Sequence, residues 1–280
     1  MVLYLALIAG ATFGAVLVWR QRAEIGLKEA YDLVNAGLPN ETEQVQAAAK
    51  RFRQRQEART LGSWLGGTTG LIVLAALGAP IIGLLWSALS GMLGVAIAIS
   101  WLHGRAIRTA GQEGPRLARL GQRRLRDYLI WPELVAQYAV LVLPVATAVI
   151  GVVVLAGYGD PRTGWTLVGV AVPCLLICGF VLVLQRRVLE LSQPAAGESE
   201  LRWEEALRAA TLRDLSETMM WAAWLLGGGA IITVDLPSRL PSFVEPLSYV
   251  LFGGGIAVLA VAQLSSSGKW GLRRSQRALG

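Results

Sequence analysis

The two cysteines of this chain, Cys174 and Cys178, lie four residues apart, which places both thiols on one face of a helix. Thiolates bind zinc or copper and carry redox chemistry. Two thiols alone make an incomplete metal site, however, and the spacing is not that of a C-x-x-C redox motif. The single histidine, His103, excludes a metal or haem site built from several histidines. We therefore expect no metal, and we expect both cysteines to be small, buried apolar side chains.

Carboxylates are the remaining candidates for chemistry, and two of them recur in one short motif. Asp127 and Asp214 each follow Leu-Arg, in Leu125–Tyr128 and Leu212–Leu215, and Ala58–Leu61 is a weaker copy. The copies are either a chance likeness or a degenerate triplication. An interfacial lipid enzyme could use the two aspartates, but no nucleotide-binding, serine-hydrolase or zinc-protease motif accompanies them. The sequence favours a protein with no catalytic site and no cofactor.

The elements that would position these residues are apolar stretches long enough to cross a bilayer. Mean hydropathy is +0.50, with 54% hydrophobic and 16% charged residues, which is typical of a multi-pass membrane protein. A helix closes its own backbone hydrogen bonds across about 30 Å of hydrocarbon. We predict an all-α integral membrane protein, a single polytopic domain over 1–280, with about seven transmembrane helices: 2–19, 61–79, 81–102, 134–157, 163–185, 219–234 and 246–266.

The basic residues predict the orientation of these helices. The segments between them at 20–60, 103–133, 186–217 and 267–280 hold 8, 7, 5 and 4 of the 26 lysines and arginines. Basic residues collect on the cytoplasmic side, so the amino terminus is expected outside and the carboxyl terminus in the cytoplasm. The net charge of +7 is then explained by contact with an anionic inner leaflet, without nucleic acid.

The arrangement predicted is one helix followed by three helical hairpins, each preceded by a helical cytoplasmic segment. The first run ends at Trp19-Arg20, and a signal peptide carries its charge at the opposite end, so we expect a retained helix. In the first cytoplasmic segment an apolar stripe has helical spacing, and Asn40 resembles a helix cap. The stripe consists of Leu27, Tyr31, Val34 and Leu38.

Two of the cytoplasmic segments are expected to meet different surroundings. The 186–217 segment holds 5 basic and 7 acidic residues, so anionic lipid does not attract it. Its apolar face of Trp203, Leu207 and Ala210 is therefore expected to dock a protein partner or to pack against the other inner segments. The more basic 103–133 segment is expected to contact lipid headgroups through Arg119, Arg123, Arg124 and Arg126.

Glycines and prolines inside the apolar stretches predict how the helices pack. Two glycine triplets lie near the middle of the last two helices, where small residues let backbones approach closely. Pro144 and Pro173 are expected to kink two other helices, freeing carbonyls that could line a cavity. The triplets are Gly227, Gly228 and Gly229, and Gly253, Gly254 and Gly255.

Two function classes remain open on these residues. The favoured one is a non-catalytic membrane subunit or accessory protein of a larger complex in a bacterial plasma (inner) membrane, docking other subunits through its cytoplasmic helices. The alternative is a permease or channel-like translocation domain energised by a separate subunit. The chain has no ionisable residue in the middle of any predicted helix, which disfavours proton-coupled transport.

Overall fold

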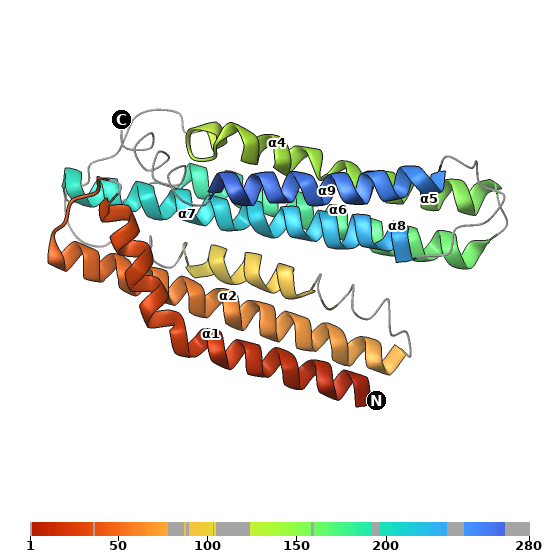
Figure 1. Ribbon diagram of the computed structural model, residues 1–280, viewed down its shortest axis with the longest axis horizontal. Coiled ribbons are helices and arrows are strands. Elements are labelled where there is room, and N and C mark those ends of the chain that lie inside the picture. The colour runs from red at the N-terminus through yellow and green to blue at the C-terminus, as the bar shows by residue number, and fades with distance from the viewer. Residues whose placement is uncertain are drawn as a thin grey trace.

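The computed structural model describes residues 2–35, 37–77, 87, 90–102, 104, 124–157, 160–191, 197–233 and 244–266. These residues are helical almost throughout and include no strand. The longer helices lie side by side along the long axis of the molecule (Figure 1). They are α1 (Val2–Asn35), α2 (Thr42–Leu77), a helix at Ser90–Leu102, α4 (Trp131–Ala139), α5 (Val142–Gly157), α6 (Pro161–Glu190), α7 (Glu198–Ala222), α8 (Gly229–Thr233) and α9 (Val244–Ser266).

Among the described residues, three helices are long and apolar enough to cross a membrane: Trp131–Gly157, Pro161–Glu190 and Glu198–Ile232. The first two contain the predicted spans 134–157 and 163–185, and the third covers most of the predicted span 219–234, which confirms a helical protein with membrane-spanning candidates. Shorter apolar helices occupy Ser90–Leu102 and Pro246–Ala260. The predicted turn at 78–80 and most of the predicted outer loop at 235–245 lie outside the described residues.

Helices α1 and α2 form a hairpin whose turn is set by Gly37. This glycine has a φ of 105°, a left-handed conformation that side chains disfavour. Gly37 N donates to Val34 O (2.9 Å) and Leu38 N to Leu33 O (3.2 Å), which is a Schellman helix end. The next helix begins at Thr42, two residues after the predicted cap Asn40. Both helices run without a break from the predicted cytoplasmic segment into the predicted span.

Backbone contact between α2 and the Ser90–Leu102 helix is unusually close. A Cβ on Gly66 would lie 2.1 Å from Ser90 O, and a Cβ on Gly62 would lie 2.5 Å from Gly94 O. The Ser90 hydroxyl donates to Gly66 O (2.6 Å), adding a hydrogen bond to the dispersion contacts. Since any side chain at these glycines would push the backbones apart, the two helices form one tightly packed unit.

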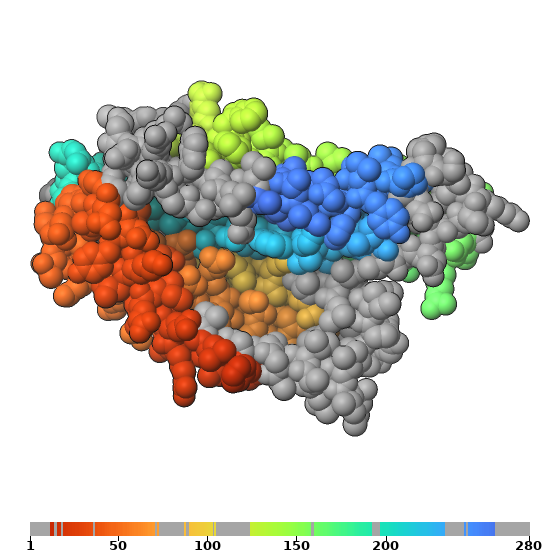
Figure 2. Space-filling view, in the orientation of Figure 1, coloured from red at the N-terminus to blue at the C-terminus, as the bar shows by residue number. Residues whose placement is uncertain are grey.

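The remaining helices surround a second core, and α7 lies at its centre. The helix Glu198–Ile232 is continuous and includes a π-helical turn, η2, at Ala223–Gly228. The predicted cytoplasmic segment ending at 217 and the predicted span beginning at 219 therefore belong to one continuous helix. Leu212, Leu215 and Met219 are fully buried in this core. In Figure 2, α7 is visible between the α1–α2 hairpin and α9.

The polar segments of the chain meet at one end of the molecule. Gln44 Nε2 donates to Ser199 Oγ (2.9 Å) across 155 residues of sequence, and Tyr128 Oη donates to Glu205 Oε2 (2.7 Å). These contacts join parts of the three segments predicted to share one side of the membrane, at 20–60, 103–133 and 186–217. The apolar parts of α5, α6 and η2 extend away from this end (Figure 1).

Candidate functional site

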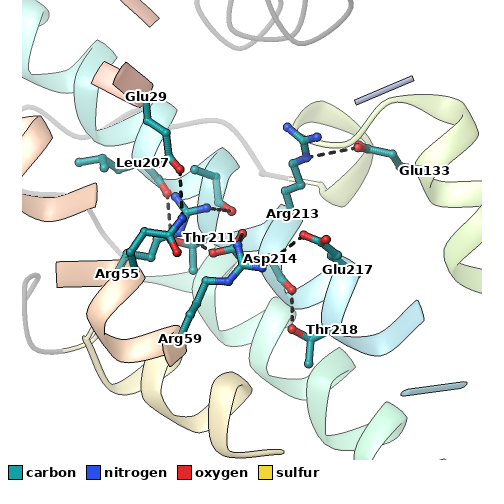
Figure 3. Close-up of polar contacts among 12 residues, drawn as sticks. Glu29, Arg55, Arg59, Glu133, Leu207, Thr211, Arg213, Asp214, Glu217 and Thr218 are labelled. Atoms are coloured by element: carbon teal, nitrogen blue, oxygen red, sulfur yellow. Dashed lines mark hydrogen bonds and ion pairs between the residues drawn. The ribbon is translucent and has the colours of Figure 1, made fainter. Parts of the chain in front are cut away.

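The strongest concentration of buried charge lies between α2 and α7, and we call it the charge cluster: Glu29, Arg55, Arg59, Asp214 and Glu217 (Figure 3). Arg55 and Arg59 are four residues apart, so α2 presents both guanidinium groups on one face. Asp214 and Glu217 are three apart and share a face of α7. The two faces meet because α2 and α7 run in the same direction side by side, as the Gln44–Ser199 and Arg59–Asp214 contacts show.

Asp214 is the centre of this cluster and is 3% exposed. Its carboxylate accepts hydrogen bonds from Arg55 Nε and from Arg59 Nη1, the latter at 3.1 Å. Arg55 also donates to the carbonyl of Ala210 (3.1 Å). Arg59 Nη2 lies 3.7 Å from Glu217 Oε2. A buried carboxylate between two cations is an ion pair with its hydrogen bonds made, which offsets its desolvation.

Glu29 extends the cluster to α1. Its Oε1 accepts from Gln56 Nε2 (3.3 Å), and the pKa of its carboxyl is raised above the usual value, chiefly because burial disfavours the charged form. The nearby Arg55 acts in the opposite direction and Asp214 in the same direction. The cluster therefore joins three helices through charges whose ionisation states depend on one another.

A second buried network lies beside the start of α7. Tyr128 donates to Glu205. The pKa of the Tyr128 hydroxyl is raised, mainly by burial and to a lesser extent by this hydrogen bond. Arg208 is fully buried, donates to Leu191 O, and has Nη1 3.8 Å from Glu205 Oε1. Its Nε and Nη1 make no hydrogen bond with the residues that the structure describes. This arrangement ties the 124–130 elbow to the ends of α6 and α7.

An amide network holds three helices together nearer the membrane-spanning region. Gln137 Nε2 donates to Gln185 Oε1 (3.0 Å), and Ser216 Oγ donates to Gln137 Oε1 (2.6 Å). All three side chains are at most 2% exposed. Paired amides are a recognised means of joining helices where water is absent. We did not predict this network, although Gln137 inside an otherwise apolar stretch was a signal for it.

The predicted docking stripe is covered within the chain. Trp203 is 4% exposed and packs with Ala30, Val45 and Phe52 from α1 and α2. Leu207 and Ala210 pack against the same cluster. Packing against the other inner segments, one of the two expected environments, is thus observed for the buried Trp203, while Leu207 and Ala210 are partly buried.

The stripe predicted on α1 is only partly correct. Val34 is partly buried and Leu38 is buried, but Leu27 and Tyr31 are 45% and 49% exposed. The buried face runs instead through Gly26 and Ala30. A Cβ on Gly26 would lie 2.8 Å from Ala49 O. The two helices cross too closely there for a larger side chain, and this turns Leu27 and Tyr31 outward.

The glycine triplets differ from one position to the next. A Cβ on Gly227 would lie 2.5 Å from Pro144 N in α5, and one on Gly228 would lie 2.8 Å from Phe252 in α9. On the other triplet, only Gly255 has a close neighbour, with Trp224 at 2.7 Å. Gly253 and Gly254 are exposed and have no neighbour within 4 Å among the described residues, so the close packing predicted at these two is not seen there. Gly229 is buried.

Pro144 does interrupt its helix, and the space around it is filled. Helix α4 ends at Ala139 and α5 begins at Val142, because proline cannot donate to the carbonyl four residues earlier. The fully buried Thr147 donates to Gly227 O (2.5 Å) in η2. Pro173 lies inside the unbroken helix α6. Cys174, beside it, is buried and donates to Ala222 O (3.5 Å).

The other predicted residues are either exposed or outside the described part of the chain. Arg124 and Arg126 are exposed at the elbow before α4, as headgroup contact requires, whereas Arg119, Arg123 and His103 fall outside the description. Asp127 is exposed and accepts from Arg124 N (2.8 Å), so its environment is unlike that of the buried Asp214. The two Leu-Arg-Asp copies therefore lie in different structures, a 3₁₀ turn and a long helix.

The charged side chains of the cluster pair with one another. The central carboxylate of the charge cluster is covered by arginines, and no cluster of three or more metal-ligating His, Cys, Asp or Glu side chains occurs among the residues that the structure covers. Comparison with protein-family models, with curated proteins and with solved structures finds no match to this chain.

Proposed function

We propose that this chain is a seven-helix protein of the bacterial inner membrane, with its amino terminus outside and its carboxyl terminus in the cytoplasm, and that it acts as a non-catalytic subunit of a larger membrane complex. The three apolar helices of spanning length support the membrane placement. The contacts that join polar segments at one end support a common cytoplasmic side for 20–60, 103–133 and 186–217, which together hold 20 of the chain's 26 basic residues.

The observation that carries the subunit role is the packed interior beside Pro144. A translocation domain needs a pathway between its helices, and the kinked backbone near Pro144 and Gly227 is where we expected one. Leu143, Thr147 and Leu226 are at most 3% exposed there. With backbone contacts as close as Gly227 to Pro144, the helices fill this space themselves. A filled centre favours a structural role over transport.

The surface proposed for partners lies on α1, in the part beyond the membrane. Leu27 and Tyr31 are four residues apart and about half exposed, so they form one outward apolar pair. Helix α2 has 36 residues and is ~54 Å long at about 1.5 Å per residue, against roughly 30 Å of hydrocarbon. The α1–α2 hairpin thus has helical surface beyond the bilayer for binding other subunits.

The orientation is tested with single cysteines at two exposed positions, one at the start of α6 and one at the start of α7. In a variant with Cys174 and Cys178 replaced by alanine, Arg162→Cys and Glu198→Cys are each labelled on intact cells with an impermeant maleimide. We expect labelling at 162 and protection at 198 until the membrane is permeabilised. The reverse pattern would overturn the proposed orientation.

The subunit role is tested by affinity purification from native membranes followed by mass spectrometry. We expect Leu27→Ser with Tyr31→Ser to remove partners while the protein still folds. The matched control is Lys28→Ser with Asp32→Ser, exposed on the same helix, which should keep them. Trp203→Ser should reduce the yield of folded protein instead. Unchanged partners in the Leu27 and Tyr31 variant would reject this surface.

A further inference from the structure

A pocket of about 170 Å³ lies at the elbow that precedes α4, and it is lined by Arg126, Asp127, Tyr128, Leu129, Ile130, Trp131 and Leu134. The apolar helix Trp131–Gly157 begins at its edge. If that helix spans the membrane, as the proposed function requires, the pocket lies at the depth of the lipid headgroups. Trp131, 75% exposed, has the amphipathic ring that favours this depth.

The wall of the pocket is fixed by buried groups. Tyr128 is 8% exposed and its hydroxyl is held by Glu205 at 2.7 Å, and Leu129 is 3% exposed. The elbow itself is closed by Leu129 N donating to Leu125 O (3.0 Å) and by the Asp127 carboxylate accepting from Arg124 N. A pocket built on anchored side chains keeps its shape before a ligand arrives, which lowers the entropy lost on binding.

The rim of the pocket carries one charge of each sign on neighbouring residues. Arg126 is exposed and makes no ion pair with any residue in the described ranges. Asp127 is also exposed, and its one bond to Arg124 N leaves lone pairs free on the carboxylate. A guanidinium binds phosphate through paired N–H groups, and a carboxylate accepts from a primary ammonium.

We propose that this pocket binds the headgroup of a phosphatidylethanolamine-type lipid. Arg126 donates to the phosphate, Asp127 accepts from the primary ammonium, and Trp131 packs beside the glycerol region. A purely anionic headgroup such as phosphatidylglycerol gains the same contact with Arg126 but meets the Asp127 charge unpaired. A choline headgroup has no N–H with which to satisfy that carboxylate.

The test is a lipid titration of the full chain in detergent, read by native mass spectrometry, with three lipids of identical acyl chains. We expect the first phosphatidylethanolamine to bind at least about fivefold more tightly than phosphatidylglycerol or phosphatidylcholine. Arg126→Gln and Asp127→Asn should each remove this preference; asparagine retains an acceptor for Arg124 N, so the elbow stays closed. Arg187→Gln is the matched control, because Arg187 is an exposed arginine near the end of α6 that does not line the pocket.

Two outcomes would overturn the site. One is phosphatidylglycerol binding as tightly as phosphatidylethanolamine, and the other is Arg187→Gln weakening binding as much as Arg126→Gln. Competition by soluble phosphoethanolamine distinguishes a lipid ligand from a free phosphate compound. We expect it to displace phosphatidylethanolamine only in large excess. Displacement at equal concentration would show that the pocket does not require a lipid. Failure here leaves the orientation and the subunit role standing, since cysteine labelling and partner recovery measure those independently.

Discussion

Asp214 pairs with arginines on a helix more than 150 residues earlier in the chain, and its burial strengthens that interaction. Its side chain is 4% exposed and that of Arg55 is 14% exposed, so water screens little of the interaction. Removing one partner of a buried ion pair leaves the other charge uncompensated. Removing one partner therefore lowers the free energy of unfolding more than replacing both partners with apolar residues would.

We predict that Asp214→Leu lowers the free energy of unfolding by about 3 kcal/mol, because Arg55 and Arg59 are left without their shared anion. Adding Arg55→Leu should restore part of that loss, since the mispaired charge is removed. Thermal or steric-trapping unfolding in detergent measures both. Arg186→Ala, which breaks the exposed Arg186–Glu190 pair, is the control and should change little. Equal losses for Asp214→Leu and Arg186→Ala would contradict the burial argument.

Glu29 predicts a pH dependence of stability. Its pKa is raised in the folded state, so the folded protein binds this proton more tightly than the unfolded chain does. The resulting stability is complete below the unfolded value near 4.5 and is lost as the pH rises through the folded pKa. Glu29→Gln should remove that decline. The free energy of unfolding of the wild-type protein and of Glu29→Gln is measured from pH 4 to pH 8. If it depends on pH in the same way in both, Glu29 has no role.

The residue types in these networks were visible in the sequence, but their partners were not. Asp214 was noted as a candidate because of its Leu-Arg-Asp motif. Its pairing with Arg55 depends on two helices lying side by side, which no spacing along the chain reveals. The same holds for the Trp203 stripe: its helical period was correct, and its burial against Phe52 required the position of α2.

At the scale of whole helices, the α2 contact with the Ser90–Leu102 helix is the tightest of those set by glycine. Gly62, Gly66 and Gly70 recur every fourth residue on α2, and their missing side chains admit the backbone of the neighbouring helix. The close approach of the two backbones adds dispersion contacts that larger side chains would prevent.

We predict that Gly66→Leu destabilises the protein by about 3 kcal/mol, because its Cβ would overlap Ser90 O and backbone cannot yield as a side chain can. Gly254→Leu is the matched control, since nothing lies within 4 Å of its Cβ position. The sequence alone led us to expect Gly254→Leu to be harmful. Melting temperatures in one detergent compare the two, and similar losses at both glycines would reject close packing as the cause.

Composition predicted the apolar helices well and their ends poorly. Charge-free runs at 134–157 and 163–185 sufficed for α5 and α6, because spanning helices need about 20 apolar residues. Acidic residues in 198–217 predicted a helical segment before the span, and the structure joins the two in one helix whose carboxylates pair with Arg51, Arg55 and Tyr128. These pairings come from distant parts of the chain and could not be read from the sequence.

At the scale of the molecule, the α1–α2 hairpin is attached to the α4–α9 bundle through α7, at the polar end. We predict that cysteines at Gln44 and Ser199 are joined by a short bismaleimide, because their side chains are in hydrogen-bond contact at 2.9 Å. Replacing Arg51, Arg55 and Arg59 together with glutamine should lower the yield several-fold. Mass spectrometry of the cross-linked peptides measures the yield of the cross-link. An unchanged yield would mean that the ion pairs do not hold the hairpin in place.

The long sequence separation of the charge cluster also sets an order of events during synthesis. Arg59 and Asp214 are 155 residues apart, so at about 5–20 residues per second roughly 10–30 s pass between their appearances on the ribosome. Through that interval Arg55 and Arg59 must remain hydrated. The early hairpin already has its own turn and glycine contacts. The hairpin is therefore synthesised first, and its arginines reach their buried partner only after α7 has been made.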